Sequence, residues 1–185
     1  VQSDLVKAKQ WFSKSADSGL AAAQFNLAII LLRDSEHRSN RVDALDWLKK
    51  ADDQEYEMAT FQLATEYLRN SENQLDREKA SQLMLKLAKK GHVRAQMQLG
   101  LLYLFGDAQD LNSEEGFFWL TESAMQDFAP AQHNLGAMYA QGIGGESNLK
   151  HAYAWLKIAS TSIAQAEVDS LIIREKISEN ELRSA

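Results

Sequence analysis

Apolar residues recur along this chain with one long, constant period. An alanine, followed four positions later by a leucine, returns every 36 residues. These residues are Ala23, Ala59, Ala95 and Ala131, with Leu27, Leu63, Leu99 and Leu135. In one period Ala95, Leu99, Leu102 and Tyr103 follow the i, i+4, i+7, i+8 spacing of a helical face. The pattern predicts one helix at this place in every period, termed helix A.

A second helix, helix B, is predicted in each period around a bulky residue with the same spacing. It carries Trp11, Trp47, Trp119 and Trp155, with Leu83 at the fifth place. A period of 20 to 50 residues is typical of repeat arrays built from such helix pairs. We therefore predict a single domain over residues 1–185. Its parts are an unpaired helix B over 4–17, four repeats over 19–54, 55–90, 91–126 and 127–162, and capping helices over 163–185, the last beginning at Ser178.

The segments between the helices carry residues that end and begin helices. Side chains that accept hydrogen bonds from free helical N–H groups stand at one repeat position before helix B, and these predicted N-caps are Asn40, Asp76, Asn112 and Asn148. Gly19 and Gly91 follow helix B, where a positive φ often ends a helix. Small residues one position after each repeat leucine predict close approach of helices A and B, and these are Ala28, Ala64, Gly100 and Gly136.

Several of these segments resemble a known family. Residues 91–106 and 131–139 are similar to helix A of a Sel1-like repeat, and residues 152–159 are similar to its helix B. The resemblance implies an all-α fold, a right-handed α-solenoid related to tetratricopeptide repeats. It also implies a scaffold or adaptor that holds a protein or peptide partner. Many such proteins are bacterial and lie in the cell envelope, which favours the periplasm or envelope on this ground alone. The first two repeats differ from the family in carrying Arg33 and Arg69 where a glycine usually ends helix A.

Composition excludes several other classes of function. The 185 residues include no cysteine, so disulfides, cysteine-ligated zinc and thiol catalysis are excluded. The net charge of −6, with no run of Lys or Arg, is not typical of a nucleic-acid-binding protein. The longest apolar run covers residues 27–32, far short of the roughly 20 residues of a membrane-spanning helix. We expect no nucleic-acid partner, no membrane span and no cofactor.

Few residues suggest catalysis or metal binding. Ser147 and Lys150 match the S-x-x-K motif of penicillin-recognising enzymes, but the K-T-G element that these enzymes also need is absent. The histidines, which are His37, His92, His133 and His151, lack the spacing of metal ligands. We predict no catalytic residue and no metal site. A β-lactamase-like or cell-wall-directed enzyme that uses Ser147 and Lys150 stays as an alternative hypothesis.

The strongest candidate binding site is the inner face of helix A, which lines the concave surface in tetratricopeptide-type solenoids. The inward positions lie two, six, nine and ten residues after each repeat alanine. They hold Phe25, Ile29, Leu32, Arg33, Phe61, Thr65, Leu68, Arg69, Met97, Leu101, Leu104, Phe105, His133, Ala137, Ala140 and Gln141. An exposed apolar strip of this size is usually an interaction site, and Arg33 and Arg69 could pair with a partner's carboxylate. Alternatively, neighbouring helices fill the strip in packing.

Three functions therefore remain open at this point. The first is a non-enzymatic module that binds a protein or peptide in the groove of the A helices, and the second is the enzyme built on Ser147. The third is a structural spacer that assembles with itself by stacking on the unpaired helix at 4–17. The sequence identifies neither the partner nor the oligomeric state, nor whether the chain is part of a longer array.

Overall fold

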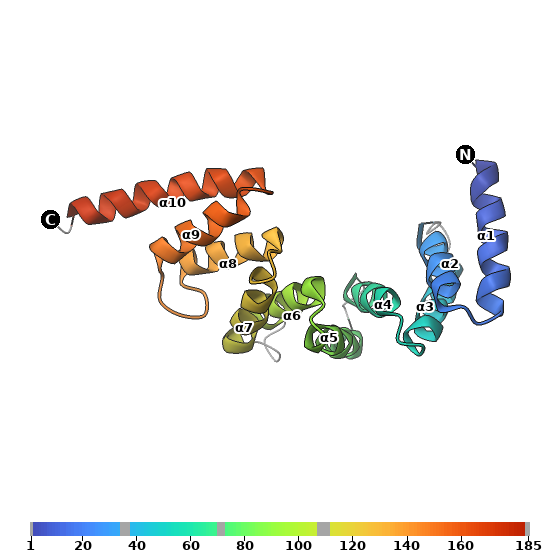
Figure 1. The fold of residues 1–185 in the computed structure, drawn as a ribbon. Coiled ribbons are helices and arrows are strands. Elements are labelled where there is room, and N and C mark those ends of the chain that lie inside the picture. Colours follow the sequence, from blue (N-terminus) through green and yellow to red (C-terminus); the bar gives the residue numbers. More distant parts are fainter. Residues whose placement is uncertain (1, 34–37, 70–72, 107–111, 184–185) are drawn as a thin grey trace. The chain divides into compact units, whose positions relative to one another are not determined.

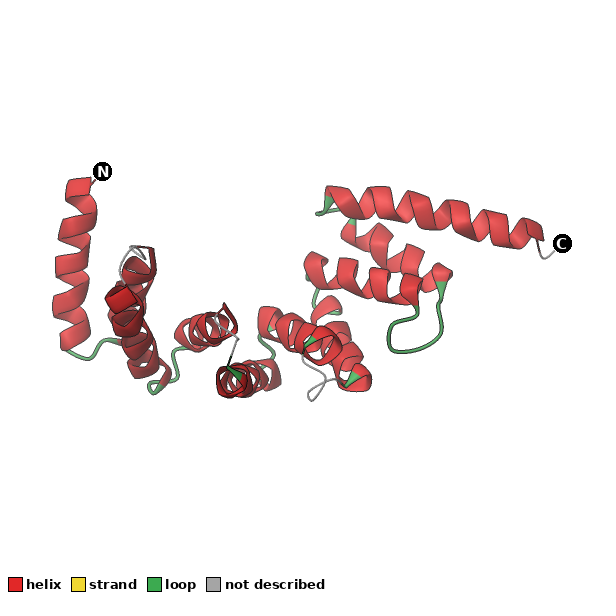
Figure 2. Cartoon of the chain, turned by 180° about the vertical axis from the view of Figure 1, so that it is seen from behind, coloured by secondary structure: helices red, strands yellow, loops and turns green. Residues whose placement is uncertain are grey.

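The computed structural model describes residues 2–33, 38–69, 73–106 and 112–183. These residues form ten α-helices and no strand (Figures 1 and 2). The B helices are α1 (Gln2–Asp17), α3 (Arg38–Asp52), α5 (Gln74–Lys89), α7 (Ser113–Ala124) and α9 (Leu149–Ala159). The A helices are α2 (Ala21–Arg33), α4 (Glu57–Arg69), α6 (Val93–Phe105) and α8 (Ala129–Gln141), and the last helix is α10 (Ala164–Arg183). The predicted alternation of A and B helices is confirmed.

The chain divides into two compact units, Val1–Leu87 and Ala88–Ala185, which are described separately. The predicted arrangement of all repeats in one domain stays a prediction. The boundary falls near the end of α5, so the first unit holds α1 to α4 and most of α5. The second unit holds α6 to α10.

In the first unit, consecutive helices from α1 to α4 pack against one another around one apolar core. Leu27 on α2, Leu48 on α3 and Leu63 on α4 are buried in this core. The small residues Ala28 and Ala64 are completely buried, as expected where helices A and B approach closely. The repeat leucines and the small residues beside them therefore hold this unit together.

The second unit shows the close approach of helices A and B directly. A Cβ atom at Gly100 of α6 would lie 2.9 Å from the carbonyl oxygen of Gly116 on α7. A Cβ atom at Gly136 of α8 would lie 2.7 Å from Leu156 Cγ on α9. Real Cβ atoms do not tolerate such distances, so the two glycines are required by packing. The predicted reason for small residues at this repeat position is confirmed.

A glutamine near the start of helix A links successive repeats. Gln24, Gln96 and Gln132 stand at one repeat position, and each is buried. Their Nε2 atoms donate to the carbonyl oxygens of Ala16 at 3.3 Å, Ala88 at 3.2 Å and Ala124 at 3.2 Å, near the ends of the preceding B helices. Helical carbonyls at this end lack partners within the helix, so these bonds stabilise the turn from B to A.

The backbone at the turns after the B helices follows the prediction. Gly19 and Gly91 have φ angles of 91° and 85°. Glu55 and Asp127 occupy the same repeat position and have φ angles of 59° and 58°. The left-handed conformation is therefore a property of the repeat position, and two turns adopt it without glycine.

The predicted N-caps hold in the later repeats only. Asn112 and Asn148 accept hydrogen bonds from the N–H groups of Glu115 and His151, each at 3.1 Å. For Asn40 and Asp76 the prediction is wrong, because α3 begins at Arg38 and α5 at Gln74, which places both residues inside the helix. No glycine or proline occurs in residues 34–40 or 70–76, so nothing in these segments prevents an earlier start.

The C-terminal segment forms one helix rather than two. We expected a new helix to begin at Ser178, but α10 continues from Ala164 to Arg183. Residues 164–183 contain neither glycine nor proline, so the serine is accommodated within the helix. Among the described residues, no helix is long and apolar enough to cross a bilayer.

Candidate functional site

The predicted inner-face residues of the first unit lie on two neighbouring A helices. Phe25, Ile29 and Arg33 are on α2, and Phe61, Thr65 and Arg69 are on α4. All except the two arginines are half-buried. The rings of Phe25 and Tyr56 lie 5.6 Å apart, and Phe25 packs against the core of the unit. Part of this strip is therefore used in packing within the chain.

The two arginines of this strip differ in their surroundings. Arg69 Nη1 lies 3.4 Å from Glu66 Oε1, and the Glu66 side chain is only 1% exposed. Arg41 of α3 completes the cluster, because its Nε lies 3.5 Å from Glu66 Oε2 and its Nη2 donates to the Glu66 carbonyl oxygen at 2.9 Å. Arg69 thus has a carboxylate partner within the chain. Arg33 is exposed and forms no ion pair with a described residue, so its pairing with an external carboxylate stays a prediction.

In the second unit, Met97, Leu101 and Phe105 lie on α6 and His133 lies on α8. Met97 packs against the core, whereas Phe105 is 60% exposed. Leu104 was expected to face inward, but it packs against α7, where a Cβ atom on Gly116 would lie 2.6 Å from Leu104 Cγ. The glycine leaves a space on α7 that the leucine fills, so Leu104 follows the alternative in which helix packing uses part of the strip.

His133 is held by the last helix. Its Nε2 lies 2.7 Å from Asp169 Oδ2 on α10, and Gln165 Nε2 donates to the other carboxylate oxygen at 2.9 Å. The hydrogen bond with His133 lowers the pKa of Asp169 below its ordinary value of 3.8, against partial burial, which raises it. Asp169 stands 36 residues after His133, at the same repeat position. The pair joins α8 to α10 on the predicted inner face.

A cleft of about 240 Å³ lies beside this pair, between α8, α9 and α10. Its walls are formed by Ala137, Ala140, Gln141, Leu156, Asp169, Ile172 and Ile173. Three of these residues, Ala137, Ala140 and Gln141, belong to the predicted inner face of helix A. Ile172 on the opposite wall is 46% exposed. The small residues predicted at the end of the strip therefore leave an open, largely apolar cleft.

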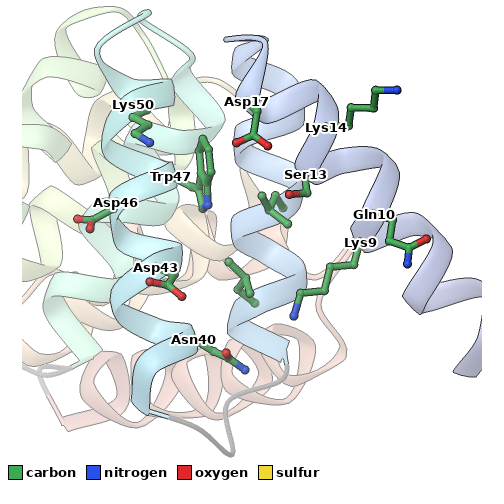
Figure 3. Close-up of a pocket in the computed structure, with 12 residues that line it drawn as sticks. Lys9, Gln10, Ser13, Lys14, Asp17, Asn40, Asp43, Asp46, Trp47 and Lys50 are labelled. Carbon is green, nitrogen blue, oxygen red and sulfur yellow. The ribbon is translucent and has the colours of Figure 1, made fainter.

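A larger groove, of about 1000 Å³, lies in the first unit between two B helices (Figure 3). One wall is formed on α1 by Lys9, Gln10, Ser13, Lys14 and Asp17, and the other on α3 by Asn40, Asp43, Asp46, Trp47 and Lys50. Leu27 and Leu31 of α2 form the floor. This groove was not predicted from the sequence. One feature of the sequence could have indicated it: Leu31 stands at a repeat position that holds a tyrosine in the other repeats, namely Tyr67, Tyr103 and Tyr139.

The residues considered for catalysis show structural roles. Ser147 is exposed, and its hydroxyl donates to the Ala140 carbonyl oxygen at 3.0 Å. His92 Nδ1 accepts a hydrogen bond from Ala95 N at 3.2 Å and caps α6. His151 stacks on Tyr139, and His37 lies outside the described residues. Within the described part of the chain, no group of three or more His, Asp or Glu residues could hold a metal ion.

The alternation of A and B helices at a 36-residue period defines a tandem helical repeat protein of the α-solenoid class. The Sel1 repeat family model matches residues 1–20, 21–54, 58–92, 93–128 and 129–162, and the chain therefore belongs to the Sel1 repeat family. The segment expected to be an unpaired helix B is thus matched as a further repeat. Members of this family are generally non-enzymatic modules for protein–protein interaction.

Solved structures agree with this assignment. A protective antigen with an SLR fold from uropathogenic Escherichia coli is 29% identical, with a TM-score of 0.82 over 96% of this chain. The chain spans only 38% of that protein's length. A Sel1 repeat protein from Oxalobacter formigenes is 26% identical, with a TM-score of 0.75 over 90% of this chain and 68% of its own. No curated protein matches the sequence.

Proposed function

We propose that this chain is a non-enzymatic interaction module that binds a protein or peptide segment on the helix-A faces of its two units. The observation that carries the proposal is the cleft beside α8. It lies at inner-face positions that the repeat register marks, and it combines the small side chains of Ala137 and Ala140 with the exposed Ile172. An open apolar cleft bordered by polar groups suits an apolar side chain of a partner.

The first unit offers a helix-A face of its own. Phe25, Ile29 and Phe61 are each half-buried, and Phe25 packs against the core of the unit, so each keeps apolar surface for a partner. Arg33 is exposed at the end of α2 and can pair with a carboxylate. In the second unit the exposed Phe105 of α6 adds apolar surface to that unit's own helix-A face. The remaining predicted residues, Thr65, Arg69, Met97, Leu101 and His133, belong to the proposal as the borders of these surfaces.

A peptide array probed with the labelled full chain tests the proposal. We expect Ile172→Asp and Phe61→Asp each to weaken the strongest peptide signals about tenfold or more, because a charge then lies in an apolar contact. Two exposed residues on the same or the adjoining helix serve as controls. Leu171→Asp on α10 and Val42→Asp on α3 place the same charge outside the proposed faces and should leave binding unchanged.

Circular dichroism is used to check that each variant is folded before its peptide binding is measured. Equal binding by the wild type and by folded Ile172→Asp and Phe61→Asp would contradict a role of the helix-A faces. The proposal contains no catalytic step. The family, whose members are generally non-enzymatic, supports this, and so does the Ser147 hydroxyl, which donates a hydrogen bond to a main-chain carbonyl. Turnover of a chromogenic β-lactam that Ser147→Ala abolishes would contradict that part.

A further inference from the structure

The groove between α1 and α3 corresponds to a place that the second unit fills with its own aromatic residues. There, Phe117 of α7, Tyr139 of α8 and His151 of α9 form one continuous stack. The ring centroids of Phe117 and Tyr139 lie 5.3 Å apart, edge to face, and those of Tyr139 and His151 lie 5.1 Å apart with the rings nearly parallel. Aromatic pairs in these geometries stabilise a packed core.

Three periods of 36 residues earlier, the same repeat positions hold Lys9, Leu31 and Asp43. None of the three is aromatic, and Leu31 is shorter than the tyrosine that it replaces. The second repeat shows that the replacement is local, because Tyr67 and Lys79 keep the equivalent contact, with Lys79 Nζ 5.4 Å from the ring centroid. The absence of the stack leaves the groove of about 1000 Å³ with the apolar floor of Leu27 and Leu31.

Each wall of this groove carries charges of both signs, with an excess of positive charge on α1 and of negative charge on α3. Lys9, Lys14 and Asp17 lie on α1, and Asp43, Asp46 and Lys50 lie on α3 (Figure 3). Within the described residues no ion pair joins one wall to the other, and Asp46 pairs only with Lys49 of its own helix, at 3.1 Å. A bound segment with one acidic and one basic side chain would complement both walls.

Trp47 supplies the aromatic surface of the groove. Its ring is half-buried, with Lys50 Nζ 3.9 Å from the ring centroid. In Figure 3 Trp47 stands between Lys50 and the residues of α1, and its ring borders the open space. Its indole N–H makes no hydrogen bond to a described residue. This edge can therefore donate to the main chain or a carboxylate of a bound segment.

We propose that the groove between α1 and α3 binds a segment of a partner protein that carries one aromatic side chain between an acidic and a basic residue. The aromatic ring takes the place of the missing stack, over Leu31 and beside Trp47. The acidic residue faces Lys9, and the basic residue faces Asp43, because these two side chains point into the space between the helices (Figure 3). This surface lies between B helices, so it is separate from the helix-A faces and does not depend on them.

The test is a fluorescence-anisotropy titration of the full chain with labelled nine-residue peptides. Their central residue is Trp, Phe or Ala, and the flanking residues are Glu and Lys in either order, two Glu or two Lys. The decisive variant is the triple substitution Lys9→Phe, Leu31→Tyr and Asp43→His, termed the filled variant, which introduces the second unit's own stack. It keeps a helical repeat scaffold because the same three residues already pack at these repeat positions.

We expect peptides with a central Trp or Phe and both charges to bind the wild type. Replacement of the centre by Ala, and the filled variant, should each weaken binding at least about tenfold. Raised salt should weaken it further, because the charged walls are exposed. Ile172→Asp, which alters the helix-A cleft, should leave this binding unchanged.

Three results would overturn the proposal. One is that no peptide binds the wild type more tightly than it binds the folded filled variant. The second is that affinity does not depend on the central aromatic residue. The third is a concentration-dependent dimer of the wild type, seen by sedimentation equilibrium and lost in the filled variant, which would assign the groove to a second copy of the chain.

Discussion

Two intervals between B helices occupy the same place in the repeat but differ in packing. One lies between α1 and α3 in the first unit, and the other lies between α7 and α9 in the second unit. In the second unit the rings of Phe117, Tyr139 and His151 contact one another across the interval. In the first unit it is an open groove bordered by charged side chains. The repeat therefore determines where the helices lie, and the few residues that vary between repeats decide whether an interval is core or surface.

A second position shows the same contrast. Glu66 of α4 and Met138 of α8 stand at one repeat position, and both are buried. Met138 packs in the apolar core of its unit, whereas Glu66 needs Arg41 and Arg69 to compensate its charge. The first unit thus carries ionic and polar groups where the second unit carries apolar ones. Three predictions test whether the contacts that distinguish the two units have the energetic consequences that they imply.

The largest effect is expected from removal of the buried carboxylate. Glu66→Ala should lower the free energy of unfolding by about 3 kcal/mol, because it leaves the guanidinium of Arg41 partly buried without its partner. The double variant Glu66→Met with Arg41→Met copies the apolar solution of the second unit and should recover most of the loss. Urea denaturation followed by circular dichroism measures both. Equal losses in the single and double variants would show that the charge is not the cause.

A smaller effect is expected from opening the filled interval. Phe117→Ala removes the ring that packs edge to face on Tyr139 and should lower the free energy of unfolding by about 2 kcal/mol. The matched change in the open interval, Lys9→Ala, should alter it by less than about 0.5 kcal/mol, because Lys9 is exposed. The same denaturation experiment compares the two. A loss of similar size in both variants would remove the distinction between a filled and an open interval.

The smallest effect concerns the hydrogen bond that joins α8 to α10. Because the folded protein lowers the pKa of Asp169 below 3.8, chiefly through His133, this carboxylate stabilises the fold above that pH. The stabilisation is lost as the pH falls through the lowered folded-state value. The stability difference between the wild type and Asp169→Asn should therefore be constant near pH 5 and shrink below about pH 4. Thermal melting at stepwise lower pH measures it, and a difference that grows on acidification would contradict the assignment.

Features that every repeat shares could be predicted from the sequence. The helices, the positive φ after helix B and the small residues at Gly100 and Gly136 all follow from positions that recur every 36 residues. The glutamine at one repeat position near the start of helix A recurs in three of the four repeats, at 24, 96 and 132, with Thr60 in the second, so it could have been found by the same comparison. A residue that has the same neighbours in every repeat leaves a periodic pattern, and such a pattern can be recognised in a single sequence.

Features that belong to one repeat could not be predicted in the same way. The early start of α3 and α5 depends on the absence of glycine in two connecting segments, and the position of Leu104 depends on the space beside Gly116. The Glu66 cluster requires Arg41, which is 25 residues away in sequence. The groove arises because the first unit lacks the aromatic residues that the second unit has at the same repeat positions. A comparison of residues that all repeats share does not reveal such a difference. The predicted inner-face residues remain proposals until a partner is tested.

The central proposal is that the open interval beside Trp47 binds an aromatic side chain. The indole N–H resonances of the four tryptophans report on it directly in a nitrogen–proton correlation spectrum, once assigned by Trp→Phe variants. Addition of the peptide with a central Trp or Phe and both charges should shift the Trp47 resonance and leave those of Trp119 and Trp155 in place. The Trp47 resonance should not move in the filled variant. A shift confined to Trp119 or Trp155, or the same Trp47 shift in the filled variant, would contradict the claim.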